Sequence, residues 1–203
     1  MASLKSANAI PYTGFLIANL SLFGGLILLG LPGSALDLLH RAAAPGTAAC
    51  VLALAFNAFI PAWLKHVLVF WRVKNVLPGH RAFSEFARTD PRINVTRLKE
   101  KCGGAFPVRA AEQNTVWYSL LHKHEEHPAV SGAHQRFLAL RDMATSALLL
   151  AVLLSIAAGI LKVDAMFYAL LYAVLGIEYL FLKVGAVNEA ERLVCSVLAQ
   201  EAL

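Results

Sequence analysis

Residues 122–127 read His-Lys-His-Glu-Glu-His and are the densest group of metal-binding or acid–base side chains in this chain of 203 residues. Imidazole and carboxylate groups three or four positions apart lie on one face of a helix, and His124 with His127, or His122 with Glu126, has that spacing. The His-Glu-x-x-His order of zinc peptidases is absent, because a lysine separates the first two histidines. We therefore interpret the run as a solvated helix end, and we predict no catalytic residue, no metal site and no cofactor.

A second group combines amide and aromatic side chains on successive turns of one predicted helix: Gln113, Asn114, Trp117 and Tyr118. Aromatic rings can stack on a base or another flat polar ligand, and amides can hydrogen-bond to its edge. In the alternative, Trp117 is buried and anchors the helix, and Gln113 and Asn114 cap neighbouring segments. We favour this structural interpretation and keep the four residues as candidates for ligand or partner binding.

Cations form the third group. Six of them fall within 21 residues: Arg81, Arg88, Arg92, Arg97, Lys99 and Lys101. Such a cluster attracts a nucleotide phosphate, a nucleic acid or an anionic lipid surface. A lipid surface is the simplest ligand, because a cation next to a membrane gains about 1 kcal/mol from an anionic leaflet. The other interpretation is that these cations only retain the segment in the cytoplasm during membrane insertion.

Three polar residues interrupt long apolar runs: Asn19, Asn57 and Glu178. A carboxylate inside hydrocarbon is energetically costly and therefore marks a candidate functional site. Glu178 lies five residues before Lys183, about 7.5 Å along a helix, so it reaches the headgroups, pairs with a cation of the basic segment, or lines an ion or proton path. Asn19 and Asn57 are expected to form hydrogen bonds between helices.

The composition identifies the class of protein. Apolar residues make up 58% of the chain and charged residues 15%, and the mean hydropathy is +0.61. A soluble domain has about 25% charged residues, so this chain belongs to the membrane proteins. The three cysteines, Cys50, Cys102 and Cys195, show neither a disulfide framework nor metal-ligand spacing, and we expect free thiols.

The apolar runs predict an all-α, polytopic membrane protein with four transmembrane helices, because about 20 apolar residues cross about 30 Å of hydrocarbon. Residues 1–71 form one hairpin, with spans at about 12–31 and 47–64 and the second helix extending to about 71. Residues 143–183 form another, with spans at about 143–161 and 166–182. Residues 72–142 form a small cytoplasmic helical domain inserted between the second and third helices, and residues 184–203 an amphipathic C-terminal helix.

The first apolar run also permits a different interpretation. Lys5 and the sequence Gly33-Ser34-Ala35 resemble the basic start and the cleavage site of a signal peptide. The run is longer than the 7–15 apolar residues typical of a signal peptide, so we interpret it as a membrane anchor.

The distribution of charge predicts the orientation in the membrane. Residues 72–142 contain 12 Lys and Arg against 7 acidic residues, whereas the two other connections contain only Arg41 and Lys162. Because cation-rich connections stay in the cytoplasm, this segment and both termini are expected on the cytoplasmic side of an inner membrane.

Small residues on one face of each apolar helix predict a compact four-helix bundle, since they let helix backbones approach closely. These faces are Gly14, Ala18, Ser21 and Gly25; Ala55, Ala58 and Ala62; Ala144, Ala147, Ala151, Ser155 and Ala158; and Ala165, Ala169, Ala173 and Gly176.

Proline and glycine divide the polar segment into short helices. We predict helices over 80–88, 95–102 and 109–126, and a further helix from about residue 130 that continues into the third span. Asp90-Pro91 and Gly103-Gly104 separate the first three.

These features lead to one hypothesis and two alternatives. In the hypothesis, a non-enzymatic membrane effector binds a soluble partner or an anionic ligand through its cytoplasmic domain and conveys that state to the bundle. The first alternative is a scaffold that recruits a soluble protein, and the second is a metal-dependent membrane enzyme using the histidine and glutamate run. A homo-oligomer is compatible with each of them.

Overall fold

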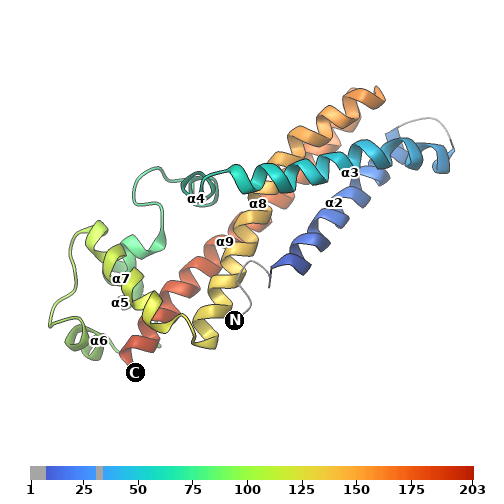
Figure 1. Cartoon of the computed structure of the whole chain (residues 1–203). Helices are drawn as coiled ribbons and strands as arrows, with labels where there is room; N and C mark the ends of the chain where they lie inside the picture. Colours follow the sequence, from blue (N-terminus) through green and yellow to red (C-terminus); the bar gives the residue numbers. More distant parts are fainter. Residues whose placement is uncertain (1–7, 31–33) are drawn as a thin grey trace. The chain divides into compact units, whose positions relative to one another are not determined.

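The structure is a computed structural model that describes residues 8–30 and 34–203. All regular secondary structure in these residues is helical, and four of the helices are long and apolar enough to cross a membrane. The predicted all-helical class and the four apolar helices are therefore confirmed. The elements are α2 (Ala9–Gly30), α3 (Ala35–Phe59), α4 (Ala62–Phe70), η1 (Pro78–Arg81), η2 (Ala82–Phe86), α5 (Ala87–Thr89), α6 (Val95–Lys101), α7 (Ala110–His124), α8 (Pro128–Leu161) and α9 (Ala165–Ala202), as Figure 1 shows.

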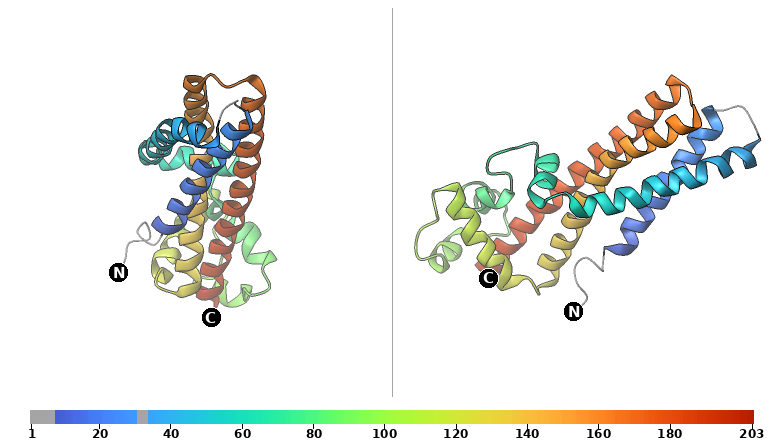
Figure 2. Two further views of the ribbon diagram at one scale, coloured as in Figure 1. Left: turned by 90° about the vertical axis from the view of Figure 1, so that its right-hand side faces the viewer. Right: turned by 45° about the horizontal axis from the view of Figure 1, so that its top comes forward.

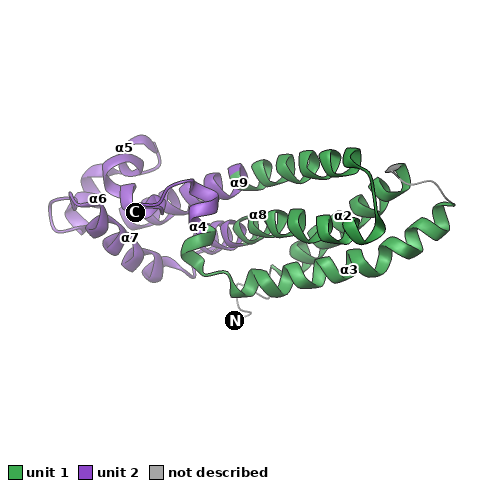
Figure 3. Cartoon of the chain, turned by 90° about the horizontal axis from the view of Figure 1, so that it is seen from above, with its two compact units in different colours: residues 1–65, 139–183 green, residues 66–138, 184–203 purple. Residues whose placement is uncertain are grey.

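The chain divides into two compact units (Figure 3). Unit 1 contains residues 1–65 and 139–183, and unit 2 contains residues 66–138 and 184–203. The helices α8 and α9 each contribute residues to both units.

Unit 1 is a bundle built from α2, α3 and the parts of α8 and α9 within residues 139–183. Its core contains apolar residues of all four helices, among them Phe23, Ala53, Leu154 and Leu171. The rings of Phe23 and Phe167 meet edge to face, with centroids 5.8 Å apart. Within this unit α8 and α9 lie side by side as a hairpin in both Figure 1 and Figure 2.

The second apolar helix differs from the prediction at both ends. It begins at Ala35 rather than near residue 47, because the Ser34 side chain accepts a hydrogen bond from the Asp37 backbone N–H and caps the helix there. Pro45 lies within this helix and does not end it. The helix ends at Phe59, since Pro61 favours an extended conformation for Ile60. The predicted continuous helix to about residue 71 is therefore wrong, and α4 is separate.

The small-residue faces are only partly confirmed. On α8, Ala144, Ala147 and Ala158 are buried, as predicted. The predicted faces of α2, α3 and α9 are mostly exposed, for example at Gly14, Ala58 and Ala173. The buried face of α9 within unit 1 instead contains larger side chains: Phe167, Leu171 and Leu175. The helix α3 also buries small residues, but on another face than predicted: Ala42, Gly46, Ala49, Cys50 and Ala53. A Cβ atom at Gly46 would lie 2.7 Å from Leu20 Cδ1 of α2, so these two helices approach each other closely there.

In unit 2, short helices pack around a core that includes Phe83, Leu98, Trp117 and Leu198. The helix α7 packs against η1 and η2. Gly79 in η1 is required for this contact, because a Cβ atom there would lie 2.5 Å from Asn114 Oδ1 and 2.6 Å from Trp117 Cε3.

The predicted helices of the polar segment correspond to observed elements. Residues 80–88 fall within η1, η2 and α5, residues 95–102 contain α6, and residues 109–126 contain α7. Gly103 and Gly104 end α6 with φ angles of 82° and 90°, which favour glycine. The predicted continuation into the third span is confirmed, since α8 runs from Pro128 to Leu161. Residues 184–202 are helical as predicted, but they continue α9 rather than form a separate helix.

Candidate functional site

Asn19 and Glu178, two of the three polar residues predicted within the apolar helices, form a direct contact in unit 1. The Asn19 Nδ2 atom donates to Glu178 Oε1 at 3.1 Å and to the Phe15 carbonyl oxygen at 3.1 Å. Asn19 is 1% exposed. The two remaining side-chain oxygens of the pair, Asn19 Oδ1 and Glu178 Oε2, are buried without a hydrogen-bond partner among the described residues.

The third predicted residue, Asn57, belongs to a second polar contact in unit 1. Its Nδ2 atom donates to the Tyr12 hydroxyl at 3.5 Å, and that hydroxyl is also hydrogen-bonded to the Ser146 hydroxyl. The Asn57 Oδ1 atom is a further buried oxygen without a partner in the described part of the chain. The prediction that Asn19 and Asn57 form hydrogen bonds between helices is therefore confirmed.

An ion pair between a buried lysine and a partly exposed aspartate forms the third polar contact of unit 1. The Lys65 Nζ atom lies 3.2 Å from Asp142 Oδ1, and the Lys65 side chain is 8% exposed. Arg141 also contacts Asp142, with its Nη2 atom 2.8 Å from the same oxygen. Asp142 is one helical turn before Ser146 on α8, and Tyr12 is two turns before Asn19 on α2. The three contacts therefore follow one another along these helices.

The helix α2 is the element that joins this polar network. Its side chains form hydrogen bonds to α3 through Asn57, to α8 through Ser146 and to α9 through Glu178. A polar group in a lipid-covered bundle finds its partners on other helices, because hydrocarbon supplies none. The first apolar run is thus an integral part of unit 1 in this structure.

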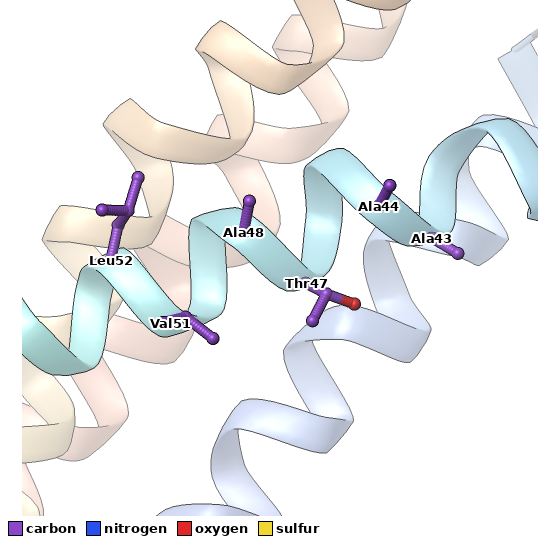
Figure 4. A pocket seen from close by; sticks show the side chains of 6 residues that line it. All are labelled: Ala43, Ala44, Thr47, Ala48, Val51 and Leu52. Atoms are coloured by element: carbon purple, nitrogen blue, oxygen red, sulfur yellow. The ribbon is translucent and has the colours of Figure 1, made fainter.

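An open groove on α3 is a separate feature of unit 1 (Figure 4). It is lined by Ala43, Ala44, Thr47, Ala48, Val51 and Leu52. Thr47 is its only polar lining residue, so the groove does not include the buried polar network.

In unit 2, the structure gives Gln113 and Trp117 internal roles. The Gln113 Oε1 atom accepts hydrogen bonds from the backbone N–H groups of Phe83 and Ser84, each at 3.1 Å, and from the Ser84 hydroxyl. These N–H groups lie in the first turn of η2, where a helix offers them no internal acceptor. Gln113 Nε2 donates to the Val108 carbonyl oxygen at 3.3 Å. Both ends of the Gln113 amide are therefore engaged in hydrogen bonds within unit 2 and offer little hydrogen-bonding capacity to a ligand.

Trp117 is 5% exposed, and its ring faces Gly79 at close range. This burial fits the structural interpretation of Trp117, in which the ring anchors α7. Asn114 Oδ1 is buried near the same glycine. Tyr118 is 49% exposed, and its ring meets the His122 ring edge to face at 4.9 Å. Tyr118 therefore remains the accessible member of this group.

The six predicted cations have different environments. Arg81 pairs with Glu85 at 2.8 Å, and Arg92 pairs with Asp90 at 2.6 Å. Hydrogen bonds from Arg92 lower the pKa of Asp90 to about 2. Lys99 lies over the ring of Phe106 at 5.6 Å. The exposed cations of the group are Arg88, Arg92, Arg97, Lys99 and Lys101.

The histidine and glutamate run does not converge on one point. His122 faces Glu125 at 3.4 Å, His127 Nδ1 accepts from the Ala129 backbone N–H, and His124 faces Glu201. Within residues 8–30 and 34–203, no three His, Cys, Asp or Glu side chains form a metal-binding group.

Sequence analysis missed Glu201, a buried carboxylate near the end of α9. Its side chain is 5% exposed and receives Lys123 Nζ at 2.8 Å and His124 Nε2 at 2.6 Å. Burial raises the pKa of Glu201, but the hydrogen bonds from Lys123 and His124 outweigh it, and the net pKa lies below the usual range. Its position on the apolar face formed by Val194 and Leu198 is the sequence signal that could have identified it.

The cysteines are free thiols, as predicted. In unit 2, burial raises the pKa of Cys195 to about 12, and the neighbouring Asp90 carboxylate adds to the shift. The Cys195 thiol is therefore protonated and unreactive near neutral pH.

Comparisons of the chain with protein-family models, curated proteins and solved structures find no match. The function is therefore inferred from the chemistry of the residues described above.

Proposed function

We propose that this chain is a non-enzymatic effector of a bacterial-type inner membrane, in which unit 2 binds an anionic ligand or a soluble partner and unit 1 responds by changing membrane permeability. The four apolar helices cross the membrane, residues 72–142 form a cytoplasmic domain, and both termini are cytoplasmic.

The observation that carries this proposal is the polar network buried in unit 1. A bundle that only anchors a protein has no need for a buried carboxylate, and polar groups inside membrane helices are costly and mark pathways for ions or protons. Glu178, Asn19, Tyr12 and Ser146 supply such groups along α2, α8 and α9.

The lengths of α8 and α9 support a cytoplasmic domain. With 34 and 38 residues, these helices are about 51 and 57 Å long, whereas the hydrocarbon layer is about 30 Å thick. Each helix therefore extends beyond the layer. The charged residues 136–142 of α8 and 189–192 of α9 lie in the portions that would project into water.

Exposed cations support binding of an anion by unit 2. Arg97 and Lys101 are one turn apart on α6, and Lys99 and Arg88 are also exposed. These side chains can face anionic lipid headgroups or an acidic surface of a soluble protein. Because cation-rich segments stay on the cytoplasmic side of a membrane, the proposed ligand is a cytoplasmic one.

The proposal is tested with the full chain in sealed vesicles that contain an ion-sensitive dye. Vesicles of phosphatidylcholine are compared with vesicles that also contain phosphatidylglycerol as the anionic ligand. We expect greater ion leakage with phosphatidylglycerol and less leakage in the Glu178→Ala variant. The Lys99→Gln/Lys101→Gln variant should lose the response to phosphatidylglycerol and keep the basal leakage.

Arg109→Gln is the matched control for these cations, since the Arg109 side chain is 84% exposed and its contact with Glu112 is 3.8 Å long. It should behave as the unsubstituted chain. Vesicles that remain tight under both conditions would overturn the permeability function. The scaffold would then be the remaining candidate, and it predicts a soluble protein that co-purifies through residues 72–142.

A further inference from the structure

The hydrogen-bonding capacity of the Asn19 and Glu178 pair in unit 1 is incomplete in one specific way. The Asn19 amide has two N–H donors, one used by the Phe15 carbonyl oxygen and one by Glu178 Oε1. The pair then has no donor left. Its two other side-chain oxygens, Asn19 Oδ1 and Glu178 Oε2, are acceptors that are buried and unpartnered among the described residues.

Reversing the amide would not remove this deficit. The Asn19 oxygen would then face the Phe15 carbonyl oxygen and the Glu178 carboxylate, which are both acceptors. A single proton on Glu178 supplies the missing donor, because a neutral acid has an O–H group beside its carbonyl oxygen. An amide and a neutral acid can thus form two reciprocal hydrogen bonds, whereas an amide and a carboxylate form one.

From this geometry we infer that Asn19 and Glu178 form a proton-binding site, in which Glu178 is held as the neutral acid by the amide of Asn19. The inference rests on the proposed function, since it names the proton as the ion that unit 1 binds. Binding transfers a proton from hydronium to Glu178 Oε2 and leaves water, and release reverses that transfer.

The groups around the site favour a proton over a metal cation. Each oxygen-binding metal ion takes several oxygen ligands, and the pair leaves only two oxygens free. No Lys, Arg or His of the described residues forms an ion pair with Glu178. A buried carboxylate without a cationic partner is more stable when neutral.

The titratable groups along the neighbouring helices provide a direction of access. Tyr12 of α2 lies about 10 Å from Asn19 along the helix axis, and its hydroxyl contacts Ser146 of α8. Asp142 and Arg141 of α8 follow one turn away, together with Lys65. From α3, Asn57 contacts Tyr12, and Cys50 lies against Leu16 of α2. Tyr12, Ser146 and Asp142 therefore provide proton-exchanging groups on the Asp142 side of Glu178.

The test is infrared spectroscopy of the full chain at neutral pH in vesicles of ether-linked lipids, which have no ester carbonyl to overlap the C=O stretch of a protonated carboxyl group. We expect this band in the unsubstituted chain. It should disappear in Glu178→Gln and shift to higher frequency in Asn19→Ala, because the acid then loses its amide partner. Glu189→Gln is the control: Glu189 pairs with Arg136 at 2.9 Å, so the band should remain.

Glutamine at position 178 can form the same two hydrogen bonds with Asn19, so Glu178→Gln is expected to fold, which circular dichroism checks. Absence of the band from the unsubstituted chain at neutral pH would overturn the inference, as would its persistence in Glu178→Gln. Proton flux measured with a pH-sensitive dye separates this inference from the proposed function. A Glu178 band in vesicles that do not leak supports the proton-binding site and contradicts the permeability function. Leakage without the band supports the permeability function and contradicts the proton-binding site.

Discussion

Two glutamates of the same helix, Glu178 and Glu201 of α9, have opposite environments. In unit 2, the Glu201 carboxylate contacts the Lys123 ammonium group and the His124 ring. In unit 1, Glu178 receives one hydrogen bond from a neutral amide and retains a buried oxygen without a partner in the described residues. The same side chain is therefore stabilised as an anion in one unit and as a neutral acid in the other.

The difference reflects the surroundings of each unit. Several carboxylates of unit 2 form ion pairs with cations, as Asp90 does with Arg92 and Glu189 with Arg136. Among the described residues of unit 1, little-exposed charged side chains lie together at Lys65, Arg141 and Asp142. The other polar contacts within this part of the chain join amides, hydroxyls and the Glu178 carboxyl group. Such a division is expected if water surrounds unit 2 and lipid surrounds unit 1.

The largest predicted effect tests whether unit 2 has its own stable core. Trp117→Ala should destabilise unit 2 by about 3–5 kcal/mol, because it leaves a large cavity among buried apolar side chains. Hydrogen exchange of the full chain in detergent should show lost protection in α6 and α7 and retained protection in α2 and α3. Tyr118→Ala is the control, since Tyr118 is half exposed, and should change little. Equal loss in both units would contradict their separation.

The next prediction applies one substitution to both glutamates. Glu201→Gln should destabilise unit 2 by about 1–3 kcal/mol, because the variant loses charge-assisted hydrogen bonds. Glu178→Gln should leave the stability of unit 1 nearly unchanged, because glutamine resembles the neutral acid. Thermal unfolding of the purified variants measures both. A similar loss at the two positions would remove the distinction between them.

This pair of variants also differs in its dependence on pH. The pKa of Glu201 is lower in the folded chain, so its stabilisation is present above the ordinary glutamate pKa and is lost as pH falls through the lowered value. Glu201→Gln should therefore reduce the acid sensitivity of unit 2. An unchanged pH profile in this variant would show that Glu201 does not contribute to it.

A third prediction compares glycines of the two units. Gly79→Ala should destabilise unit 2 by about 1–3 kcal/mol, since its Cβ atom would overlap Asn114 and Trp117. Gly14→Ala in α2 should be neutral or slightly stabilising, because nothing lies within 4 Å of that Cβ position and alanine favours the helix. Thermal unfolding distinguishes them, and a tolerated alanine at position 79 would contradict the described contact between η1 and α7.

The smallest predicted effect concerns the Asp90 and Arg92 pair. Arg92→Gln should raise the pKa of Asp90 from about 2 toward its ordinary value of 3.8, because the hydrogen bonds from the guanidinium are lost. The pair stabilises the fold above pH 3.8, and this contribution disappears as pH falls through about 2. The change in stability at neutral pH should be below about 1 kcal/mol, since Arg92 is exposed. A nuclear magnetic resonance titration of Asp90 measures the shift.

The sequence was sufficient to predict the helices of the polar segment, because proline and glycine act locally. The break at Asp90-Pro91 and the end of α6 at Gly103 and Gly104 are of this kind. The start of α3 was mispredicted, because Pro45 and Gly46 resemble a helix end and yet lie within one. Two local contacts favour the longer helix: the hydrogen bond to the Ser34 cap and the ion pair between Arg41 and Asp37.

The site residues could be predicted only in part. Asn19, Asn57 and Glu178 were identifiable because polar residues are rare in apolar runs. Their partners were not, because hydrogen-bond partners such as Tyr12 and Ser146 are 134 residues apart. Which helix faces meet depends on packing over the whole bundle, and the exposed small residues of α2 and α9 show that periodicity alone does not determine it.

In the proposed topology, four helices cross a membrane and residues 72–142 lie in the cytoplasm. The most direct measurement is labelling of single cysteines in intact cells by a membrane-impermeant maleimide, in a variant whose three natural cysteines are replaced by alanine. Arg88→Cys and Lys162→Cys are matched sites, since both residues are exposed in the structure. With this topology we expect labelling at position 162 from outside the cell, and labelling at position 88 only after the membrane is opened. Labelling of position 88 in intact cells would contradict it.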